Sequence, residues 1–244
     1  MKNDPYVMAT FLKAREQDQW AADGTRPIVT ISRQHGTSGD QIAVRTAELL
    51  TEMGHGKQPW ITVDKTMTER VLNEHHLSPR VTGFLTGEET ASIENHIESM
   101  LGISVAYETV IEKMTQTMIH IAKLGHVVLV GRAANVVTAG FPRAVHVRVV
   151  GSFDRRVERL MEKQNCSRDV AMAEITEVDE NRRHFVARNF KSDITDPLLY
   201  DMTFNTDRIS VEEAARIIAH LVSSPDFREK EARHLVELRH QVLG

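Results

Sequence analysis

Short runs of β-branched and other apolar residues are separated along this chain by longer segments in which apolar residues recur at helical spacing. The short runs have strand length and cover residues 27–31, 59–63, 126–130, 144–150 and 201–205. The third is apolar at almost every position, which is typical of a strand buried on both faces of a parallel sheet. Strands that alternate with helices in this way predict an α/β fold with a mainly parallel sheet and helices on both faces.

Amphipathic helices are predicted between these runs. They cover residues 40–53, 104–125, 153–164, 167–190 and 211–221, where apolar residues recur three and four positions apart. Ser152 and Ser167 are expected N-caps, and Ser210 forms a capping box with Glu213. A second capping box, Thr66 with Glu69, predicts a further helix after the second strand.

The chain divides into a core and two extensions. Residues 1–26 are expected to form an N-terminal helical extension, residues 27–222 the α/β domain, and residues 223–244 a C-terminal helix. The segment from about 167 to 195 is expected to fold over the domain as a lid, and residues 77–102 to cover the site. The terminal helices are extra to the core and offer surfaces for a homo-oligomer.

Composition narrows the class of protein. The 244 residues carry 30 Lys and Arg against 34 Asp and Glu, a net charge of −4, which gives no general electrostatic reason to bind nucleic acid or an anionic membrane. The single cysteine, Cys166, excludes an internal disulfide, and the polar first residues do not resemble a signal peptide. No apolar run approaches the ~20 residues that span a bilayer. We therefore expect a cytoplasmic protein.

The first strand is followed by a glycine-bearing loop and a helix start. Gly36 and Gly39 can adopt backbone angles that other residues avoid, and the free N–H groups of the next helix face this loop. Such a junction binds phosphate, although an ordinary strand-to-helix turn would have the same pattern. Compared with the Walker A pattern, Gly39 or Asp40 stands at the lysine position and Arg33 at the first glycine. The loop therefore lacks the usual lysine.

Further charged residues follow the other predicted strands. Asp64 and Arg132 stand directly after two of them, where open α/β sheets bind ligands. Asp64 would equally suit a helix start, and Arg132 a structural ion pair. Arginines of the predicted lid helix would close over the same edge, although charged helix faces are more often only solvated. Converging amides, guanidinium groups and a carboxylate suit the binding of two phosphorylated molecules.

Several segments resemble the cytidylate kinase-like family of P-loop nucleoside monophosphate kinases. The resemblance rests on residues 31–43, 63–65, 130–133, 145–149 and 179–182, and on the later segments 196–201 and 205–206. It implies a three-layer α/β/α kinase core, ATP or another nucleoside triphosphate as donor, Mg²⁺, and an arginine-bearing lid. In cytidylate kinase an aspartate follows the Gly-Arg pair and contacts the nucleotide, whereas here Ala133 follows Arg132.

The resemblance and the motifs together predict a site. The donor phosphates are expected at Ser32, Gly36, Thr37, Ser38, Gly39, Asp40 and Gln41, with Thr37 or Ser38 as Mg²⁺ ligand and Arg33 in place of the lysine. Acceptor binding is expected at Asp64, Arg132, Asp179, Arg182, Arg183 and Arg188, with Arg132, Arg182 and Asp64 also catalytic.

These residues predict a phosphotransferase whose acceptor is a small phosphorylated molecule, a nucleoside monophosphate such as CMP or dCMP being favoured. Two alternatives stay open. One is a silent nucleotide-binding module with a regulatory or assembly role, and the other is a kinase of a non-nucleotide metabolite.

Overall fold

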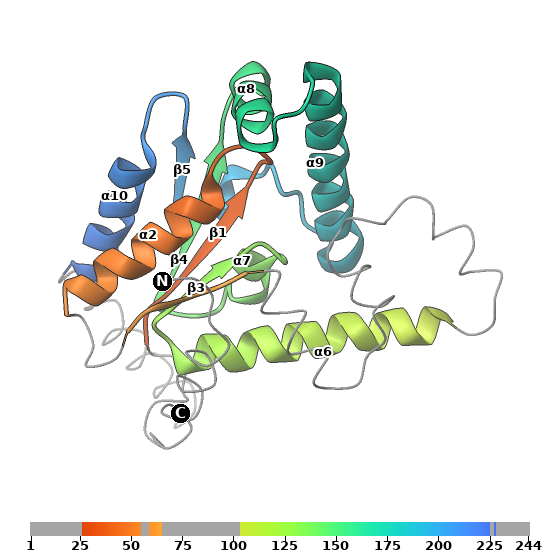
Figure 1. Cartoon of the computed structure of the whole chain (residues 1–244). Coiled ribbons are helices and arrows are strands. Elements are labelled where there is room, and N and C mark those ends of the chain that lie inside the picture. The colour runs from red at the N-terminus through yellow and green to blue at the C-terminus, as the bar shows by residue number, and fades with distance from the viewer. Residues whose placement is uncertain (1–25, 55–58, 65–102, 225–226, 228–244) are drawn as a thin grey trace, which may run out of the picture.

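A five-stranded parallel sheet forms the centre of the molecule in the computed structural model, which describes residues 26–54, 59–64, 103–224 and 227 (Figure 1). The strand order is β2-β3-β1-β4-β5, so the strand that precedes the glycine loop lies in the middle. The strands are β1 (Ile28–Arg33), β2 (Ile61–Val63), β3 (Val127–Val130), β4 (Ala144–Val150) and β5 (Met202–Asn205).

Both neighbours of β1 run parallel to it. Ile31 pairs with Val130 of β3 on one side and with Val147 of β4 on the other. Because all strands run in one direction, their carboxyl ends meet at the same edge of the sheet. Chain segments that follow β1, β3 and β4 therefore emerge side by side, at the edge where open α/β sheets bind ligands.

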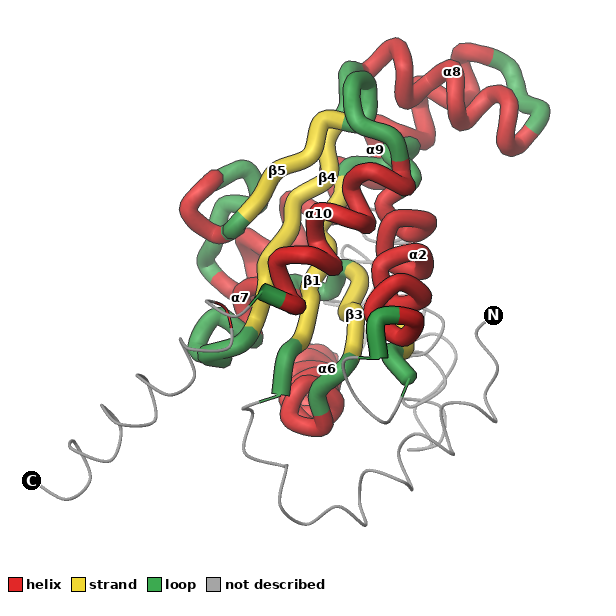
Figure 2. The backbone as a smooth tube through the Cα atoms, turned by 90° about the vertical axis from the view of Figure 1, so that its left-hand side faces the viewer, coloured by secondary structure: helices red, strands yellow, loops and turns green. Residues whose placement is uncertain are grey.

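Helices cover both faces of the sheet. On one face, α2 (Gly39–Glu52) and α10 (Val211–Ser223) pack on alternate residues of β1 and β4, with Ile42, Leu50 and Ile218 fully buried between them. On the other face, α6 (Ile103–Leu124) packs on β3 through Met114 and Met118, and the short α7 (Ala134–Val137) packs against β1. Figure 2 shows the sheet between these layers. The predicted three-layer α/β/α architecture is confirmed.

Two further helices stand at the carboxyl end of the sheet. The helices α8 (Phe153–Gln164) and α9 (Arg168–Phe190) form a hairpin around a small apolar cluster that contains Val157, Leu160 and Ile175. Figure 1 shows them above the loop that follows β1. A short 3₁₀ turn, η1 (Pro197–Leu199), then leads into β5. The segment predicted as a lid is therefore a long helix beside the loop.

The predicted helix starts are largely those of the structure. Ser167 caps α9 through its side chain, and Ser210 forms the predicted capping box with Glu213. Ser152 occupies the N-cap of α8, but its side chain accepts no capping hydrogen bond, and its backbone N–H donates instead to Asp207. The carboxylate of Asp207 therefore accepts the N–H of the N-cap residue itself, one of the donors that a helix start leaves without an intrahelical partner.

The predicted terminal extensions and the second capping box lie outside the described residues, apart from residues 26, 223, 224 and 227. The segment 77–102, expected to cover the site, lies outside them as well. Among the helices that the structure describes, none is long and apolar enough to cross a membrane.

Candidate functional site

The loop between β1 and α2 contains a row of backbone N–H groups that bond to no protein acceptor in the described part of the chain. Gly36 has φ +78° and Ser38 has φ +60°, so the chain turns sharply twice before α2 begins. In the described part of the chain, the N–H groups of residues 36–40 donate to no protein acceptor, whereas those of Gln41 and Ile42 bond to the carbonyl of Ser38. Free amides at a helix N-terminus, reinforced by the helix dipole, form a site for an anion.

One expectation about this loop is wrong. Ser38, rather than Gly39, adopts the left-handed conformation, although Ser38 carries a side chain. Gly39 is required for another reason, because a Cβ atom there would lie 2.7 Å from Cβ and 2.9 Å from Cγ of Arg33. The absence of a side chain at position 39 therefore leaves room for the arginine to cross the loop.

The guanidinium of Arg33 lies between two strand ends. Its Nε donates to Asp40 Oδ1 at 3.1 Å. Its Nη1 lies so close to Gly131, which follows β3, that a Cβ there would be 2.2 Å away. Only 15% of the Arg33 side chain is exposed, compared with 67% for Asp40. The Arg33 side chain thus packs on Gly39, one of the two candidates for the Walker A lysine position, and its guanidinium lies against the turn that contains Arg132.

The helix α9 is attached to the loop by a set of polar contacts. Asp179 accepts hydrogen bonds from the backbone N–H of His35 at 2.7 Å and from Arg156 of α8 at 2.5 Å. Glu174 contacts the His35 ring at 2.8 Å, and Arg182 donates to the backbone carbonyl of Arg33 at 3.0 Å. Asp179, predicted to bind the acceptor, therefore joins the two helices to the loop.

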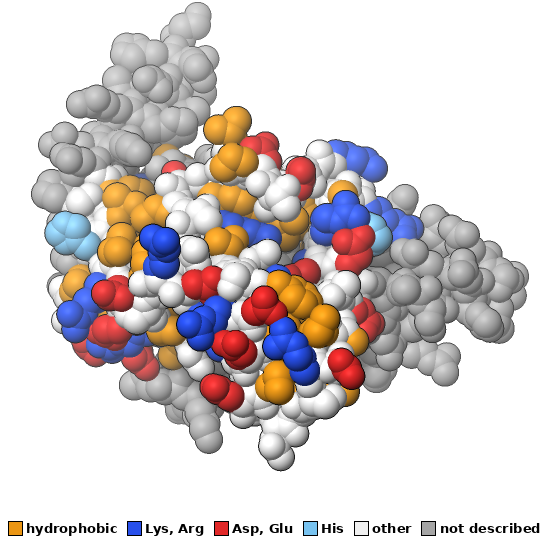
Figure 3. All heavy atoms as spheres, turned by 90° about the horizontal axis from the view of Figure 1, so that it is seen from above, with side chains coloured by type: hydrophobic (Ala, Val, Ile, Leu, Met, Phe, Trp, Pro, Cys, Tyr) orange, Lys and Arg blue, Asp and Glu red, His pale blue; other side chains and the backbone are white. Residues whose placement is uncertain are grey.

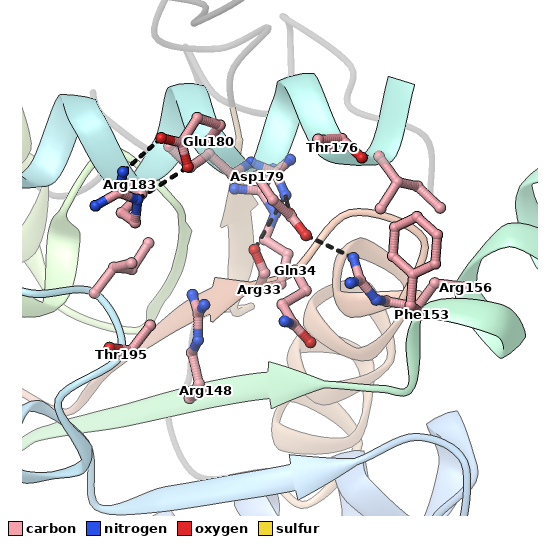
Figure 4. A pocket seen from close by; sticks show the side chains of 13 residues that line it. Arg33, Gln34, Arg148, Phe153, Arg156, Thr176, Asp179, Glu180, Arg183 and Thr195 are labelled. Atoms are coloured by element: carbon pink, nitrogen blue, oxygen red, sulfur yellow. Dashed lines mark hydrogen bonds and ion pairs between the residues drawn. The ribbon is translucent and has the colours of Figure 1, made fainter. Parts of the chain in front are cut away.

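A pocket of about 280 Å³ lies between the loop, the end of β4 and α9 (Figure 4). Arginines project into it from several elements, and the carboxylates of Asp179 and Glu180 project from α9. Its lining consists of Arg33, Gln34, Arg148, Phe153, Arg156, Ile175, Thr176, Asp179, Glu180, Arg182, Arg183, Ile194 and Thr195. With five guanidinium groups and two carboxylates, the pocket carries an excess of positive charge.

This positive charge is poorly solvated. Burial, followed by repulsion from Arg33, lowers the pKa of Arg182 from its usual value. Burial also lowers the pKa of Arg148 on β4, and Tyr200 and Asp179 oppose that shift. Desolvation of like charges is unfavourable unless an anion offsets it. The pocket therefore suits a phosphate or another anionic group.

On the outside of this end of the molecule, basic side chains alternate with acidic and apolar ones (Figure 3). They form no continuous basic area among the described residues of that view. This face therefore offers no extended basic surface, whereas five guanidinium groups line the pocket, which suits a small anionic ligand.

The turn after β3 holds three successive residues at positive φ: Gly131 at +76°, Arg132 at +58° and Ala133 at +55°. Such angles cost about 1–3 kcal/mol for a residue with a side chain and persist where packing enforces them. Here Ala133 is 5% exposed and packs against Val186 and Ile194. The position at which cytidylate kinase has an aspartate is therefore covered by α9 and the segment after it.

Other predicted residues lie apart from the pocket. Asp64 follows β2, which β3 separates from β1, and Arg188 is exposed beyond the pocket on α9. Thr37 is buried, and its hydroxyl donates to the carbonyl of Gln34 at 2.8 Å. Ser38 makes no side-chain capping bond. None of these residues lines the pocket.

The structure also adds residues that the sequence reasoning did not select. Arg148, Arg156 and Gln34 line the pocket, and Tyr200 stacks near Arg148 with 5.9 Å between the guanidinium carbon and the ring centre. The sequence contains one indication that Arg148 has a special role. It stands inside a strand whose neighbours Val147 and Val149 are apolar, and a charge in such a position needs an explanation.

Comparison with known proteins places the chain in a family. The model of the cytidylate kinase-like family matches residues 28–208. Cytidylate kinase from Methanocaldococcus jannaschii is 20% identical over 161 residues, which cover 65% of this chain and 90% of that protein.

Among solved structures, an uncharacterized protein from Eubacterium ventriosum has a TM-score of 0.56 at 17% identity, covering 81% of this chain and 98% of that one. Shikimate kinase from Bacteroides thetaiotaomicron has a TM-score of 0.42 at 14% identity, covering 88% and 98%. Because the family model spans well over half of the sequence, this chain belongs to the cytidylate kinase-like family.

Proposed function

We propose that this protein transfers the γ-phosphoryl group of ATP, or of another nucleoside triphosphate, to a small acceptor that is already phosphorylated. A nucleoside monophosphate such as CMP or dCMP is the favoured acceptor. The observation that carries the proposal is the combination of free amides at residues 36–40 with a cationic pocket directly beside them. Phosphoryl transfer depends mostly on positioning and on charge stabilisation, and this combination supplies both.

The donor phosphates would lie on the amides of residues 36–40, with Arg33 as the cation that replaces the lysine. For this, Arg33 must exchange Asp40 for a phosphate. Asp40 is largely exposed, so their ion pair contributes at most about 1 kcal/mol. A polyphosphate carries more charge than a carboxylate and accepts the guanidinium fork in a bidentate manner. The exchange is therefore favourable.

Mg²⁺ usually keeps several waters and binds through few protein ligands together with the phosphates of the substrate. In the described residues no cluster of three or more acidic, histidine or cysteine side chains is placed for a metal. Of the two predicted ligands, Ser38 has the available hydroxyl, since Thr37 is buried and bonded to Gln34. The ion would offset phosphate charge.

The acceptor would bind in the pocket between the loop, the end of β4 and α9. Arg182 lies in the pocket and holds the carbonyl of Arg33, so it can contact a phosphoryl group in transit between donor and acceptor. Arg183 lines the pocket from the same helix, paired with Glu180. Arg132 does not line the pocket but follows Gly131, which lies against the Arg33 guanidinium; from this turn it would anchor the acceptor phosphate.

Incubation of the protein with MgATP and a panel of mononucleotides and phosphorylated metabolites tests this proposal. We expect formation of ADP together with a product that carries one more phosphate. Replacement of Arg155, which is 66% exposed and paired with Glu158 on α8, provides a control that removes an arginine outside the pocket. Absence of product across the panel would refute the enzyme proposal.

One observation from the sequence and one from the structure favour the alternatives and make them testable. The missing lysine favours a nucleotide-binding module without turnover, which calorimetry would reveal as MgATP binding in the absence of any product. The burial of Ala133 under α9 favours an acceptor other than a cytosine nucleotide, which the metabolite arm of the panel would reveal.

A further inference from the structure

Arg148 differs from the other arginines of the pocket. Within the described residues, each of the others has a carboxylate within 4.0 Å: Arg33 with Asp40, Arg156 with Asp179, Arg182 with Asp179, and Arg183 with Glu180. The guanidinium of Arg148 has none in that part of the chain, although the residue is only 8% exposed. A guanidinium that is buried without a counter-charge is costly for the folded protein.

The neighbours of Arg148 hold its side chain toward the pocket without a direct ion pair, although Asp179 and Asp193 attract it from beyond 4.0 Å. Its Nη1 donates to the hydroxyl of Ser32 at 2.7 Å, and its guanidinium lies over the Tyr200 ring. The Tyr200 hydroxyl donates to the carbonyl of Ile194 at 2.9 Å, which fixes the ring. In Figure 4 the side chain of Arg148 rises from β4 toward α9, with Thr195 on one side and Gln34 on the other. Its remaining donors are directed to the space that a ligand would fill.

The position of Arg148 separates it from the donor phosphates. Val147 and Val149 belong to the core cluster beneath α2 and α10, so Arg148 points to the opposite face of the sheet, because strand residues alternate. The pocket is lined by Arg33 and Gln34 but by none of the residues 36–40. An anion at Arg148 would therefore lie beside the amide cradle.

We propose that Arg148 binds an oxyanion group, a phosphate or a carboxylate, of the acceptor molecule. This inference rests on the proposed function, because it assigns a contact to the second substrate of that reaction. The pocket of about 280 Å³ accommodates such a group. Guanidinium binds both kinds of oxyanion in a bidentate manner. Binding gives Arg148 the directly contacting counter-charge that it lacks among the described residues.

The test compares the thermal stability and ligand affinity of the full-length protein with those of Arg148→Met, with Arg155→Met as the control. The probes are inorganic phosphate, malonate and MgATP, each measured against chloride at equal ionic strength. We expect Arg148→Met to melt at the same temperature as the wild type or higher, since it removes a desolvated charge. Its affinity for the preferred small anion should fall about 10- to 100-fold, the range of a charge-assisted hydrogen bond.

The two small anions distinguish the source of the oxyanion, since stronger binding of phosphate indicates a phosphorylated acceptor and stronger binding of malonate a carboxylate. MgATP affinity should stay within about threefold of the wild type, because the cradle is intact, and the control should match the wild type with every probe. A wild-type protein that responds to neither anion overturns the assignment. So does an Arg148→Met variant with unchanged anion affinity, or with an equal loss for MgATP.

If Arg148→Met fails to fold, Arg148→Lys replaces it, because lysine keeps the charge but lacks the bidentate fork. Weaker anion binding at an unchanged melting temperature then supports the assignment, and unchanged binding overturns it. Failure of the proposed function is distinguishable, since a wild type that binds a small anion through Arg148 but does not bind MgATP refutes the kinase proposal alone.

Discussion

Arg33 is the residue whose replacement most sharply tests how this loop works without a lysine. In Arg33→Met the aliphatic part of the side chain can still pack against Gly39, while the guanidinium near Gly131 is lost. The variant also loses the ion pair with Asp40. Because the Asp40 side chain is mostly exposed, this pair contributes at most about 1 kcal/mol to the free energy of unfolding. The fold should therefore change little in stability.

The effect on catalysis should be much larger. Removal of one preorganised group that stabilises transition-state charge costs about 10²- to 10³-fold in kcat, or about 2.7–4 kcal/mol. We expect this loss for Arg33→Met in a coupled assay of ADP formation with the acceptor identified by the panel. Arg33→Lys should recover part of the rate, because it restores a cation without the planar fork.

Arg155→Met is the matched control, since it removes an arginine of similar chemistry from an exposed ion pair on α8. It should keep the rate within about twofold, in line with the small energies of exposed ion pairs. If Arg33→Met folds normally and retains at least a third of the wild-type kcat, Arg33 is not the replacement for the lysine.

Three further predictions concern the loop and the core. Ser38→Gly should raise the free energy of unfolding by about 1 kcal/mol in urea denaturation, because it relieves a left-handed conformation; a loss of stability would contradict this. Gly39→Ala should displace Arg33, lower the activity, and lower the free energy of unfolding by about 1–3 kcal/mol. The control is Gly140→Ala, where an added Cβ meets nothing within 4 Å; it should change neither quantity. Burial, with repulsion from nearby arginines, lowers the pKa of His126 from 6.5 to about 4. The unfolded chain therefore binds more protons in that window and stability falls as pH drops from 6.5 to 4; urea denaturation of His126→Asn should show a shallower fall, and an identical slope would refute the assignment.

The fold could be predicted from the sequence because its elements are locally encoded. The apolar runs have strand length, and serines mark the helix starts at Ser167 and Ser210. The alternation of strands and helices then implies a parallel sheet. The strand order and the attachment of α9 to the loop could not be predicted in this way. His35 and Asp179 are 144 residues apart, and no local pattern specifies such a pairing.

The part of the candidate site that could be predicted is the part that belongs to a recognisable sequence motif. The loop after β1 and the arginine that crosses it were identified from glycine spacing and the missing lysine. Arg148 was missed because it interrupts an apolar strand and carries no motif of its own. Gly39 was selected for the wrong reason, since its close approach to Arg33 depends on a side-chain path that spacing does not reveal.

The most direct test of the central claim is a crystal structure of the protein with Mg²⁺ and a non-hydrolysable ATP analogue. The account predicts that the β- and γ-phosphates lie on the amides of residues 36–40 and that the Arg33 guanidinium has left Asp40 to contact them. A structure in which the analogue binds with its phosphates elsewhere, or in which Arg33 stays paired with Asp40 beside a bound triphosphate, would contradict it.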